Sequence, residues 1–356
     1  MANAFFSDLL STISERGRVL LGRASPANDK QDASELLELC EALLSGRGEA
    51  SGTAMAREVL DRYHHLDAAG RLSFFQTLAR DFGPDHARLA QAIDAWRAKA
   101  NGEDASDLHF ASEPRRQELI RRLNRAPGGT GELVSIRSDL LSLMKGNKDL
   151  AALDRDVVHL LSSWFNRGFL VLRRIDWSSP ANILEKIIRY EAVHEIRDWD
   201  DLRRRIDPVD RRCYAFFHPA LADAPLIFVE VALTEAIPGA IAPLLAVNRQ
   251  PVPADRARTA VFYSIYNTQR GLGGISFGSF LIKQVVEELR RELPKLDTFV
   301  TLSPVPGFMQ WVKQADDVPL SDEDRQLLES LGKPGWPDNA ELATQLRTVL
   351  EPLAAY

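Results

Sequence analysis

A glycine-rich segment, Gln269–Gly274, is the part of this 356-residue chain that is best suited to bind an anion. Its three glycines let backbone N–H groups approach a ligand closely, and Ser276 is a candidate cap for a following helix. The N-terminus of a helix carries partial positive charge, and Arg270 adds a full charge beside the loop. The pattern therefore predicts a site for a pyrophosphate group, although an ordinary tight turn between a strand and a helix would also explain the glycines.

The segments on either side of this loop predict a strand–helix–strand crossover. Val261–Tyr266 has the period-two alternation of a strand. Apolar residues then recur at helical spacing from Phe277 to Leu293, and Pro294 ends the pattern. Thr298–Leu302 predicts a second strand. Such a crossover places the loop between the end of a strand and the start of a helix.

Two serines near the loop are candidate catalytic residues. Ser276 lies in Gly274–Gly278, which matches the G-x-S-x-G elbow of hydrolases. A hydrolase of that kind needs a histidine after its serine, and the last of the seven histidines is His218, so this interpretation is disfavoured. Ser303 follows the second strand, where two prolines stiffen the turn. From its position alone, Ser303 could equally serve to satisfy local backbone groups.

Other polar clusters favour structural roles. His64 and His65 are adjacent, so on a helix they point about 100° apart and are poorly placed to share a metal ion. His218 precedes a proline, which indicates a turn more than a catalytic group. A basic cluster on a predicted helix suits a solvated face, with contact to a partner as the alternative. Its members are Arg115, Arg116, Arg121, Arg122 and Arg125.

Several separate motifs within residues 164–311 resemble the malonyl-CoA decarboxylase family. They are Phe262-Tyr263-Ser264-Ile265, Gly271-Leu272, Phe280-Leu281-Ile282-Lys283 and Ser303-Pro304-Val305-Pro306-Gly307-Phe308, and further back Glu191-Ala192-Val193-His194, Trp199, Arg203-Arg204-Arg205, Arg211-Arg212-Cys213-Tyr214 and Val231-Ala232-Leu233-Thr234. The resemblance implies a fold like that of GNAT-type acetyltransferases, in which the corresponding loop holds the coenzyme A pyrophosphate. It implies malonyl-CoA as substrate, acetyl-CoA and CO2 as products, and no metal or other cofactor.

The resemblance also assigns roles to individual residues. Ser303 matches the family's catalytic serine. The expected malonyl-CoA-binding residues are Gln269, Arg270, Gly273, Gly274, Ile275, Ser276, Phe277, Gly278, Ser279 and Ser303. The family's proton donor is a histidine well beyond this serine, and no histidine follows Ser303, so we expect the chain to lack the C-terminal end of the family's catalytic domain. Two alternatives stay open: a coenzyme A-dependent acyltransferase of GNAT type, and a non-catalytic module for coenzyme A binding or assembly.

The hydrophobic pattern predicts an α+β chain of two domains. Residues 1–165 are expected to form an all-α domain for packing or oligomerisation, and residues 166–356 a GNAT-like mixed sheet with flanking helices. The helices predicted in the first domain are Phe5–Ile13, one beginning at Ser34–Cys40, Met55–Tyr63, Arg71–Phe82, Ala87–Lys99, Leu119–Leu123, Leu133–Met144 and Leu150–Phe165. The elements predicted in the second domain are strand Phe169–Leu172, helices Ala181–Tyr190 and Trp199–Ile206, strands Cys213–Phe217 and Leu226–Leu233, the crossover, and helices Met309–Lys313, Glu323–Leu331 and Glu341–Leu353.

Composition narrows the class of protein and its partners. The net charge of −6 gives no support for nucleic-acid binding. Two cysteines, Cys40 and Cys213, make neither a disulfide framework nor a metal set, which suits a reducing compartment. No apolar run approaches the ~20 residues that span a bilayer, and the first residues lack the basic segment of a signal peptide. We expect a cytoplasmic homo-oligomer without membrane contact.

Overall fold

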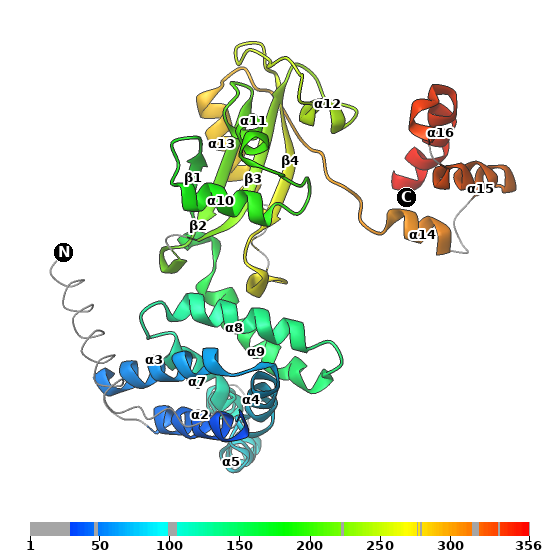
Figure 1. The fold of residues 1–356 in the computed structure, drawn as a ribbon. Coiled ribbons are helices and arrows are strands. Elements are labelled where there is room, and N and C mark those ends of the chain that lie inside the picture. Colours follow the sequence, from blue (N-terminus) through cyan, green and yellow to red (C-terminus); the bar gives the residue numbers. More distant parts are fainter. Residues whose placement is uncertain are drawn as a thin grey trace. The chain divides into compact units, whose positions relative to one another are not determined.

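The computed structural model describes residues 29–45, 49–98, 105–221, 224–275, 277, 280–314, 320–333 and 335–355. The chain divides into two compact units, one reaching Val300 and the other running from Thr301 to Tyr356. The first unit combines a group of helices with a five-stranded sheet, and the second contains helices (Figure 1). The predicted α+β class is confirmed. The helix predicted at Phe5–Ile13 lies outside the described residues.

The helical part of the first unit precedes the sheet. Its helices are α2 (Asp29–Leu44), α3 (Glu49–His65), α4 (Ala68–Asp81), α5 (His86–Ala98), α6 (Ser106–Ser112), α7 (Arg115–Leu123), α8 (Gly129–Leu143) and α9 (Ala151–Trp164). Their apolar faces meet around fully buried residues such as Leu36, Leu60 and Leu119. Among the described residues no strand precedes Val171, as the helical periodicity predicted. Helix α6 was not predicted.

The sheet has the spatial order β1-β2-β3-β4-β5. Its strands are β1 (Val171–Ile175), β2 (Arg211–Phe217), β3 (Pro225–Thr234), β4 (Thr259–Asn267) and β5 (Thr298–Thr301). Strands β1 to β4 pair antiparallel with their neighbours. Strand β4 leads through the glycine-rich loop and helix α13 (Phe280–Glu292) to β5, so the predicted crossover is confirmed. The first strand begins later than predicted, because Arg167–Phe169 forms a 3-10 turn.

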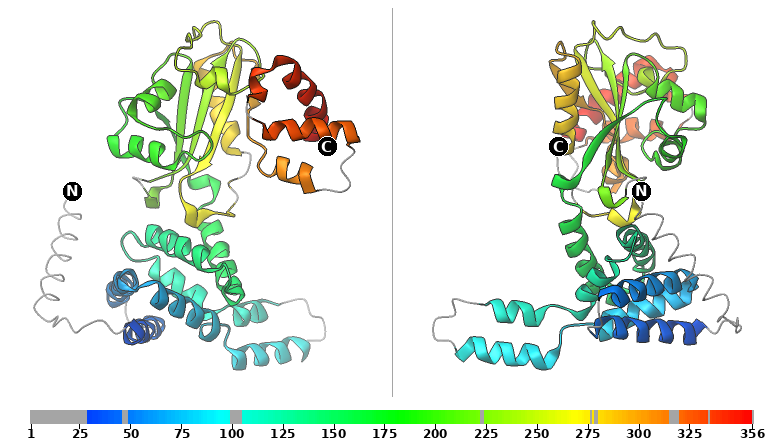
Figure 2. Two further views of the ribbon diagram at one scale, coloured as in Figure 1. Left: turned by 45° about the vertical axis from the view of Figure 1, so that its right-hand side comes forward. Right: turned by 90° about the vertical axis from the view of Figure 1, so that its left-hand side faces the viewer.

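Helices cover both faces of the sheet. Helices α10 (Ala181–Tyr190) and α11 (Trp199–Ile206) lie on one face and α13 lies on the other (Figure 2). The short helix α12 (Ala242–Leu245) lies in the segment before β4. The pattern had placed the start of α13 at Phe277, which is wrong: Phe277 precedes the helix and is buried in the core. Burial of its ring explains the apolar residue without an extra helical turn.

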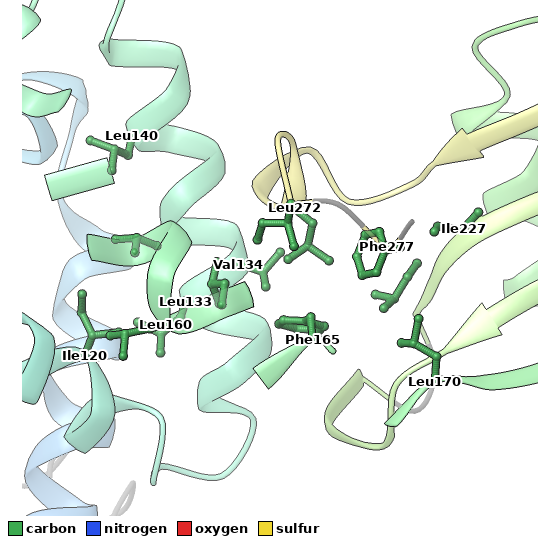
Figure 3. Packing of buried hydrophobic residues seen from close by; sticks show 14 of the residues in the cluster. Ile120, Leu133, Val134, Leu140, Leu160, Phe165, Leu170, Ile227, Leu272 and Phe277 are labelled. Atoms are coloured by element: carbon green, nitrogen blue, oxygen red, sulfur yellow. The ribbon is translucent and has the colours of Figure 1, made fainter. Parts of the chain in front are cut away.

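The helical part and the sheet share one hydrophobic core (Figure 3). Leu133 and Val134 of α8 and Phe165 belong to it, and so do Leu272 and Phe277 from the segment after β4. This shared core explains why both parts belong to the same compact unit. The expected domain boundary after residue 165 stays a prediction.

The second unit is a small helical assembly. It contains α14 (Phe308–Gln314), α15 (Asp322–Glu329) and α16 (Ala340–Ala355), which confirms the three predicted C-terminal helices. Val312 and Leu353 are its buried centre. Ser321 caps α15 by accepting a hydrogen bond from the Asp324 N–H, and the Asp324 carboxylate accepts from Ser321 in return. Among the helices that the structure describes, none is long and apolar enough to cross a membrane.

Candidate functional site

The segment between β4 and α13 forms a short structured loop and not a sharp elbow. The Thr268 N–H donates to the carbonyl of Leu226 at 2.9 Å, which continues the pairing of β4 with β3 by one residue. Arg270–Leu272 then forms a 3-10 turn, and Gly274 adopts a positive φ of 78°. Only glycine takes that backbone conformation without strain. The nucleophile-elbow interpretation of Gly274–Gly278 gains no support from this length of loop, and Ser276 and Gly278 lie outside the described residues.

The inner side of the loop lies directly against helix α8. Leu272 is fully buried in the shared core (Figure 3). A side chain at Gly271 would place its Cβ 1.8 Å from the carbonyl oxygen of Val134. That distance is far inside van der Waals contact, so position 271 requires glycine for packing against the helix and not for ligand access.

Arg137 holds this inner side from within α8. Its guanidinium is 2% exposed, and Nη1 donates hydrogen bonds to the carbonyl oxygens of Gly271 at 2.6 Å and of Gly273 at 2.8 Å. Its Nε donates to the Asp154 carboxylate of α9 at 2.9 Å. The buried arginine therefore satisfies two loop carbonyls and is itself neutralised by a carboxylate.

Arg137 was not among the residues predicted for the site, although the sequence contains a signal for it. Leu133, Val134 and Leu140 line the buried stripe of α8, and Arg137 occupies the same stripe. An arginine in a buried stripe needs acceptors, because leaving a buried charge without partners is very costly. That position marks Arg137 as a residue with an internal partner, but it does not say that the partner is the loop.

The outer side of the loop is open to solvent. Arg270, Gly273 and Gly274 are exposed. The Gly274 N–H has no hydrogen-bond partner within the part of the chain that the structure describes. Since a trans peptide plane directs N–H and C=O in opposite directions, the bond from Arg137 to the Gly273 carbonyl turns the Gly274 N–H away from α8. An exposed N–H beside an arginine can receive an anionic group.

The remaining predicted site residues fall into four groups. Ile275 and Phe277 are buried, so their side chains belong to the core and only their backbone could contact a ligand. Ser276, Gly278 and Ser279 lie outside the described residues. Gln269 is half-buried, and its amide donates to the Pro225 carbonyl at 3.4 Å. Ser303 belongs to the second unit, where it follows β5 and is exposed.

The histidines that were weighed as functional residues have structural partners. Nε2 of His64 lies 2.5 Å from a Glu132 carboxylate oxygen, whereas His65 contacts the Asp61 carbonyl at 2.7 Å, so the two rings do not share a ligand. His218 is buried, accepts a hydrogen bond from the Ala220 N–H at Nδ1 and contacts the Trp164 carbonyl through Nε2 at 3.1 Å. Burial lowers its pKa. His218 is therefore a packed turn residue in its neutral form.

The basic cluster before α8 is also structural. Arg116 pairs with Asp156 at 2.5 Å, Arg122 with Glu118 at 2.7 Å, and Arg121 with Glu113. These pairs tie α7 to its neighbours or along its own surface. Within the described residues no group of His, Cys, Asp and Glu side chains is arranged to hold a metal ion.

These features define an α+β protein with an exposed glycine-rich loop at a strand–helix junction. Two family models match the chain: the malonyl-CoA decarboxylase N-terminal domain over residues 82–165, and the malonyl-CoA decarboxylase C-terminal domain over residues 168–356. The chain belongs to the malonyl-CoA decarboxylase family. The family suggested by the sequence motifs is thus confirmed.

Relatives of known name agree with this family. The mitochondrial malonyl-CoA decarboxylase of Anser anser anser is 39% identical over 276 residues, which are 72% of this chain and 53% of the relative. The mitochondrial enzyme of Rattus norvegicus is 37% identical over 261 residues, covering 69% of this chain and 53% of the relative. The chain thus spans about half the length of the curated relatives that it matches.

Solved structures of bacterial relatives extend the comparison. The crystal structure of malonyl-CoA decarboxylase from Rhodopseudomonas palustris is 59% identical, with a TM-score of 0.85, and covers 91% of this chain and 80% of that one. The enzyme from Agrobacterium vitis is 57% identical, also with a TM-score of 0.85, and covers 90% and 79%. The expected likeness to GNAT-type acetyltransferases stays a prediction.

Proposed function

We propose that the chain acts as a malonyl-CoA decarboxylase, which converts malonyl-CoA to acetyl-CoA and CO2. Membership of the family gives the reaction class. The observation that carries the proposal is the loop after β4, where the Gly274 N–H, which no described residue accepts from, lies near the exposed Arg270. A loop of this kind suits the phosphates of coenzyme A, which supply most of the charge of the substrate.

Binding at the loop involves mainly the backbone. The proposed contacts are the Gly273–Gly274 peptide, the backbone of Ile275 and Phe277, and the residues Ser276, Gly278 and Ser279 that precede α13. Arg270 contributes charge at the outer side, and Gln269 supports the base of the loop through its bond to Pro225. This division keeps the apolar side chains of Ile275 and Phe277 in the core.

The reaction requires little more than orientation and two polar groups. The bond between the malonyl Cα and its carboxylate breaks, CO2 leaves, and the electron pair passes into an enolate of the thioester. A hydrogen-bond donor stabilises the enolate oxygen, and an acid then protonates Cα to give the acetyl group. We assign Ser303 to orientation of the departing carboxylate or to transfer of that proton. This chemistry does not require a metal ion or an organic cofactor.

The test measures products and not only the disappearance of substrate. The purified chain is incubated with malonyl-CoA labelled with ¹³C in the free carboxyl group, and CO2 and acetyl-CoA are quantified by mass spectrometry. Equal amounts of both products are expected. Acyl transfer to an added amine would instead identify an acyltransferase. Binding of desulfo-coenzyme A without any turnover would identify a coenzyme A-binding or assembly module.

We further propose that residues 1–165 form a helical domain that mediates homo-oligomerisation, and that residues 166–356 form the coenzyme A-binding domain. The two family models meet at the same junction, between residues 165 and 168. Limited proteolysis is expected to cut near Asn166 or Gly168, both of which are exposed. Sedimentation of the intact chain and of fragments 1–165 and 166–356 then tests which part carries the association. A monomeric intact chain would contradict the oligomer.

A further inference from the structure

The contacts of Arg137 reach from the helical part of the chain to the proposed coenzyme loop. The residue lies on α8, its guanidinium is 2% exposed, and its Nη1 is the common donor to the Gly271 and Gly273 carbonyls at 2.6 and 2.8 Å. Both carbonyls lie at backbone positions that the sheet and α13 do not pair. The hydrogen bonds of the short 3-10 turn are accepted by Gln269, Arg270 and Leu272 instead, so within the described residues these two carbonyls depend on the guanidinium.

Asp154 fixes the orientation of this arginine. The carboxylate accepts from Nε at 2.9 Å, so the planar guanidinium is held along one edge by α9 while its Nη1 points at the loop. Arginine presents several donors in a rigid fork, whereas lysine offers a compact charge on a flexible stem. The arrangement of one carboxylate and two carbonyls around one side chain therefore suits arginine and not lysine.

The direction of the loop peptides follows from this contact. Because Arg137 holds the Gly273 carbonyl on the inner side, the N–H of Gly274 in the same peptide plane points to the outer side. A donor that is already oriented before the ligand arrives loses little entropy on binding. We propose that Arg137 is a positioning residue of the coenzyme loop, which it presets from the helical part of the chain, with Asp154 orienting Arg137. This inference rests on the proposed function of the loop.

Three variants of the full chain test the proposal. Arg137→Met removes the hydrogen-bond donors, and Arg137→Lys keeps the positive charge but lacks the planar guanidinium. Arg155→Met is the control, since Arg155 is the exposed neighbour of Asp154. Calorimetry with desulfo-coenzyme A is expected to show affinity weakened about 10-fold or more in Arg137→Met, less in Arg137→Lys, and unchanged in Arg155→Met. In turnover assays KM should rise while kcat changes little, because Arg137 does not touch the reacting atoms.

Hydrogen exchange separates failure of the positioning role from failure of the proposed function. In the ligand-free chain, Leu272, Gly273 and Ile275 use their N–H groups within the loop. Their peptide is expected to exchange faster in Arg137→Met than in the wild type or Arg155→Met, whether or not the chain binds coenzyme A. Unchanged exchange of the loop overturns the positioning role. Faster exchange without any wild-type affinity for desulfo-coenzyme A overturns the proposed function and with it the coenzyme part of the inference.

A second inference comes from buried polar side chains between the sheet and α11. Glu230 of β3 is fully buried and lies opposite Ser264 of β4, whose hydroxyl donates to Glu191 at 2.8 to 2.9 Å. Arg205 of α11 lies 3.6 Å from the Glu230 carboxylate and 3.8 Å from that of Asp201. Glu230 is therefore close to a second buried carboxylate, Glu191, and to the Arg205 guanidinium, whereas Asp201 also pairs with Arg204 at 3.2 Å.

Although Tyr263 and Glu191 lie close enough to Glu230 to affect its pKa, several polar atoms in this group have no hydrogen bond of regular geometry to any described residue. They are both carboxylate oxygens of Glu230, the Tyr263 hydroxyl, and Nε and Nη1 of Arg205. Tyr263 is the extra residue of a β-bulge, since Glu230 pairs with Ser264 while Val231 pairs with Phe262. Buried polar atoms are normally satisfied by protein or by internal water, and a water needs two to four such partners.

We propose that this group encloses internal water and that Glu230 keeps a proton there at neutral pH. Burial and the neighbouring Glu191 raise the pKa of Glu230 to about 8, against the opposing effect of Arg205. The other titratable or charged groups that interact with it are Arg211, Cys213, Tyr263 and Tyr266, and His194 lies beside Tyr263 and Glu191. Burial lowers the pKa of His194 and raises those of Cys213 and both tyrosines, so these four stay neutral at neutral pH.

Protonation of Glu230 would make the stability of the folded chain depend on pH in a predictable direction. A carboxyl group whose pKa is higher in the folded chain than in the unfolded chain favours folding at low pH, and this contribution is lost as pH rises to the folded value, here about 8. Glu230→Gln copies the protonated form without titrating, and Glu185→Gln on the exposed surface is the control. From about pH 6 to pH 8 the wild-type melting temperature is expected to fall relative to that of Glu230→Gln. Glu185→Gln should follow the wild type.

If the melting temperatures of the wild type and Glu230→Gln change in parallel across this pH range, Glu230 is not protonated as proposed. If Glu230→Gln does not fold, difference infrared spectroscopy of the wild type with ¹³C-labelled glutamate detects the carbonyl stretch of a protonated acid directly, and its absence at neutral pH overturns the proposal equally. A high-resolution crystal structure tests the water. Ordered water between Glu230, Tyr263 and Arg205 supports the hydrated site, and a dry interior contradicts it.

Discussion

The two sides of the glycine-rich loop differ in what they require of the sequence. On the inner side, Gly271 lies so close to Val134 that any side chain would collide with a backbone carbonyl. On the outer side, Gly273 and Gly274 are exposed, and a Cβ at Gly274 would have no neighbour within 4 Å. Glycines two or three positions apart therefore serve packing in one case and, as we propose, ligand access in the other.

This difference explains why a count of glycines is weak evidence for a phosphate site. The ordinary-turn interpretation is correct for Gly271, whose role is close packing, whereas the anion-site interpretation concerns Gly273 and Gly274. Only the position of α8 distinguishes them, and α8 lies more than a hundred residues earlier in the chain. Substitutions on the two sides should consequently have different effects, on folding for the inner side and on binding for the outer side.

The largest effect on stability is expected from Gly271→Ala. The new Cβ would lie 1.8 Å from the Val134 carbonyl oxygen, so the loop or α8 must shift. Overpacking of this kind costs about 3 kcal/mol or more when the obstacle is backbone. Calorimetry should show a marked fall in the melting temperature. Gly52→Ala, within helix α3 and with open space around it, is the matched control and should leave stability unchanged or slightly raised.

Most of the fold could be predicted from the sequence because it depends on local periodicity. The helical stripes before residue 166 and the alternation at Val261–Tyr266 predicted most of the described elements in the right order, with α6 the helix that was missed. Boundaries set by tertiary contacts were less predictable. Phe277 fits a helical stripe, but its burial beside Leu272 in the core keeps it outside α13, and the sequence pattern does not contain that competition.

The site could be predicted only where one segment contains the relevant residues. The glycines, Arg270 and the strand–helix context are contiguous, so the loop was found. Arg137 contacts the loop, and Asp154 contacts Arg137, across a long stretch of chain. Ser264 connects Glu230 with Glu191, because it pairs with Glu230 between β3 and β4 and donates to Glu191. Ser303 was chosen through its motif, and its role stays a prediction.

The second-largest effect is expected on kcat, from a substitution at Ser303. Ser303→Ala should lower kcat by roughly 100-fold, the usual scale for loss of a positioned donor or proton-transfer group, in a form of the protein that turns over malonyl-CoA. Affinity for coenzyme A should change much less, since binding depends on the nucleotide end. Ser321→Ala, which removes the cap of α15, is the control for a serine in the same unit and should leave kcat unchanged. Mass spectrometry should find no acyl group on Ser303 or Ser276. An acylated Ser276 peptide would restore the hydrolase interpretation.

Gly273→Asp tests the outer side of the loop without the collision that affects the inner side. A Cβ at Gly273 lies 3.1 Å from the Arg270 carbonyl, which is tight but at the exposed surface, so the chain should fold with a melting temperature close to that of the wild type. The added carboxylate would stand where phosphate oxygens are proposed to bind, and repulsion between like charges should weaken desulfo-coenzyme A binding by about 10-fold at low salt. Because the site is exposed, added salt should reduce the difference between variant and wild type. Gly83→Asp, far along the chain and with open space around it, should bind as the wild type does. If Gly273→Asp folds and binds with unchanged affinity at low salt, the phosphates do not contact this side of the loop, and the contrast between the two sides is one of packing alone.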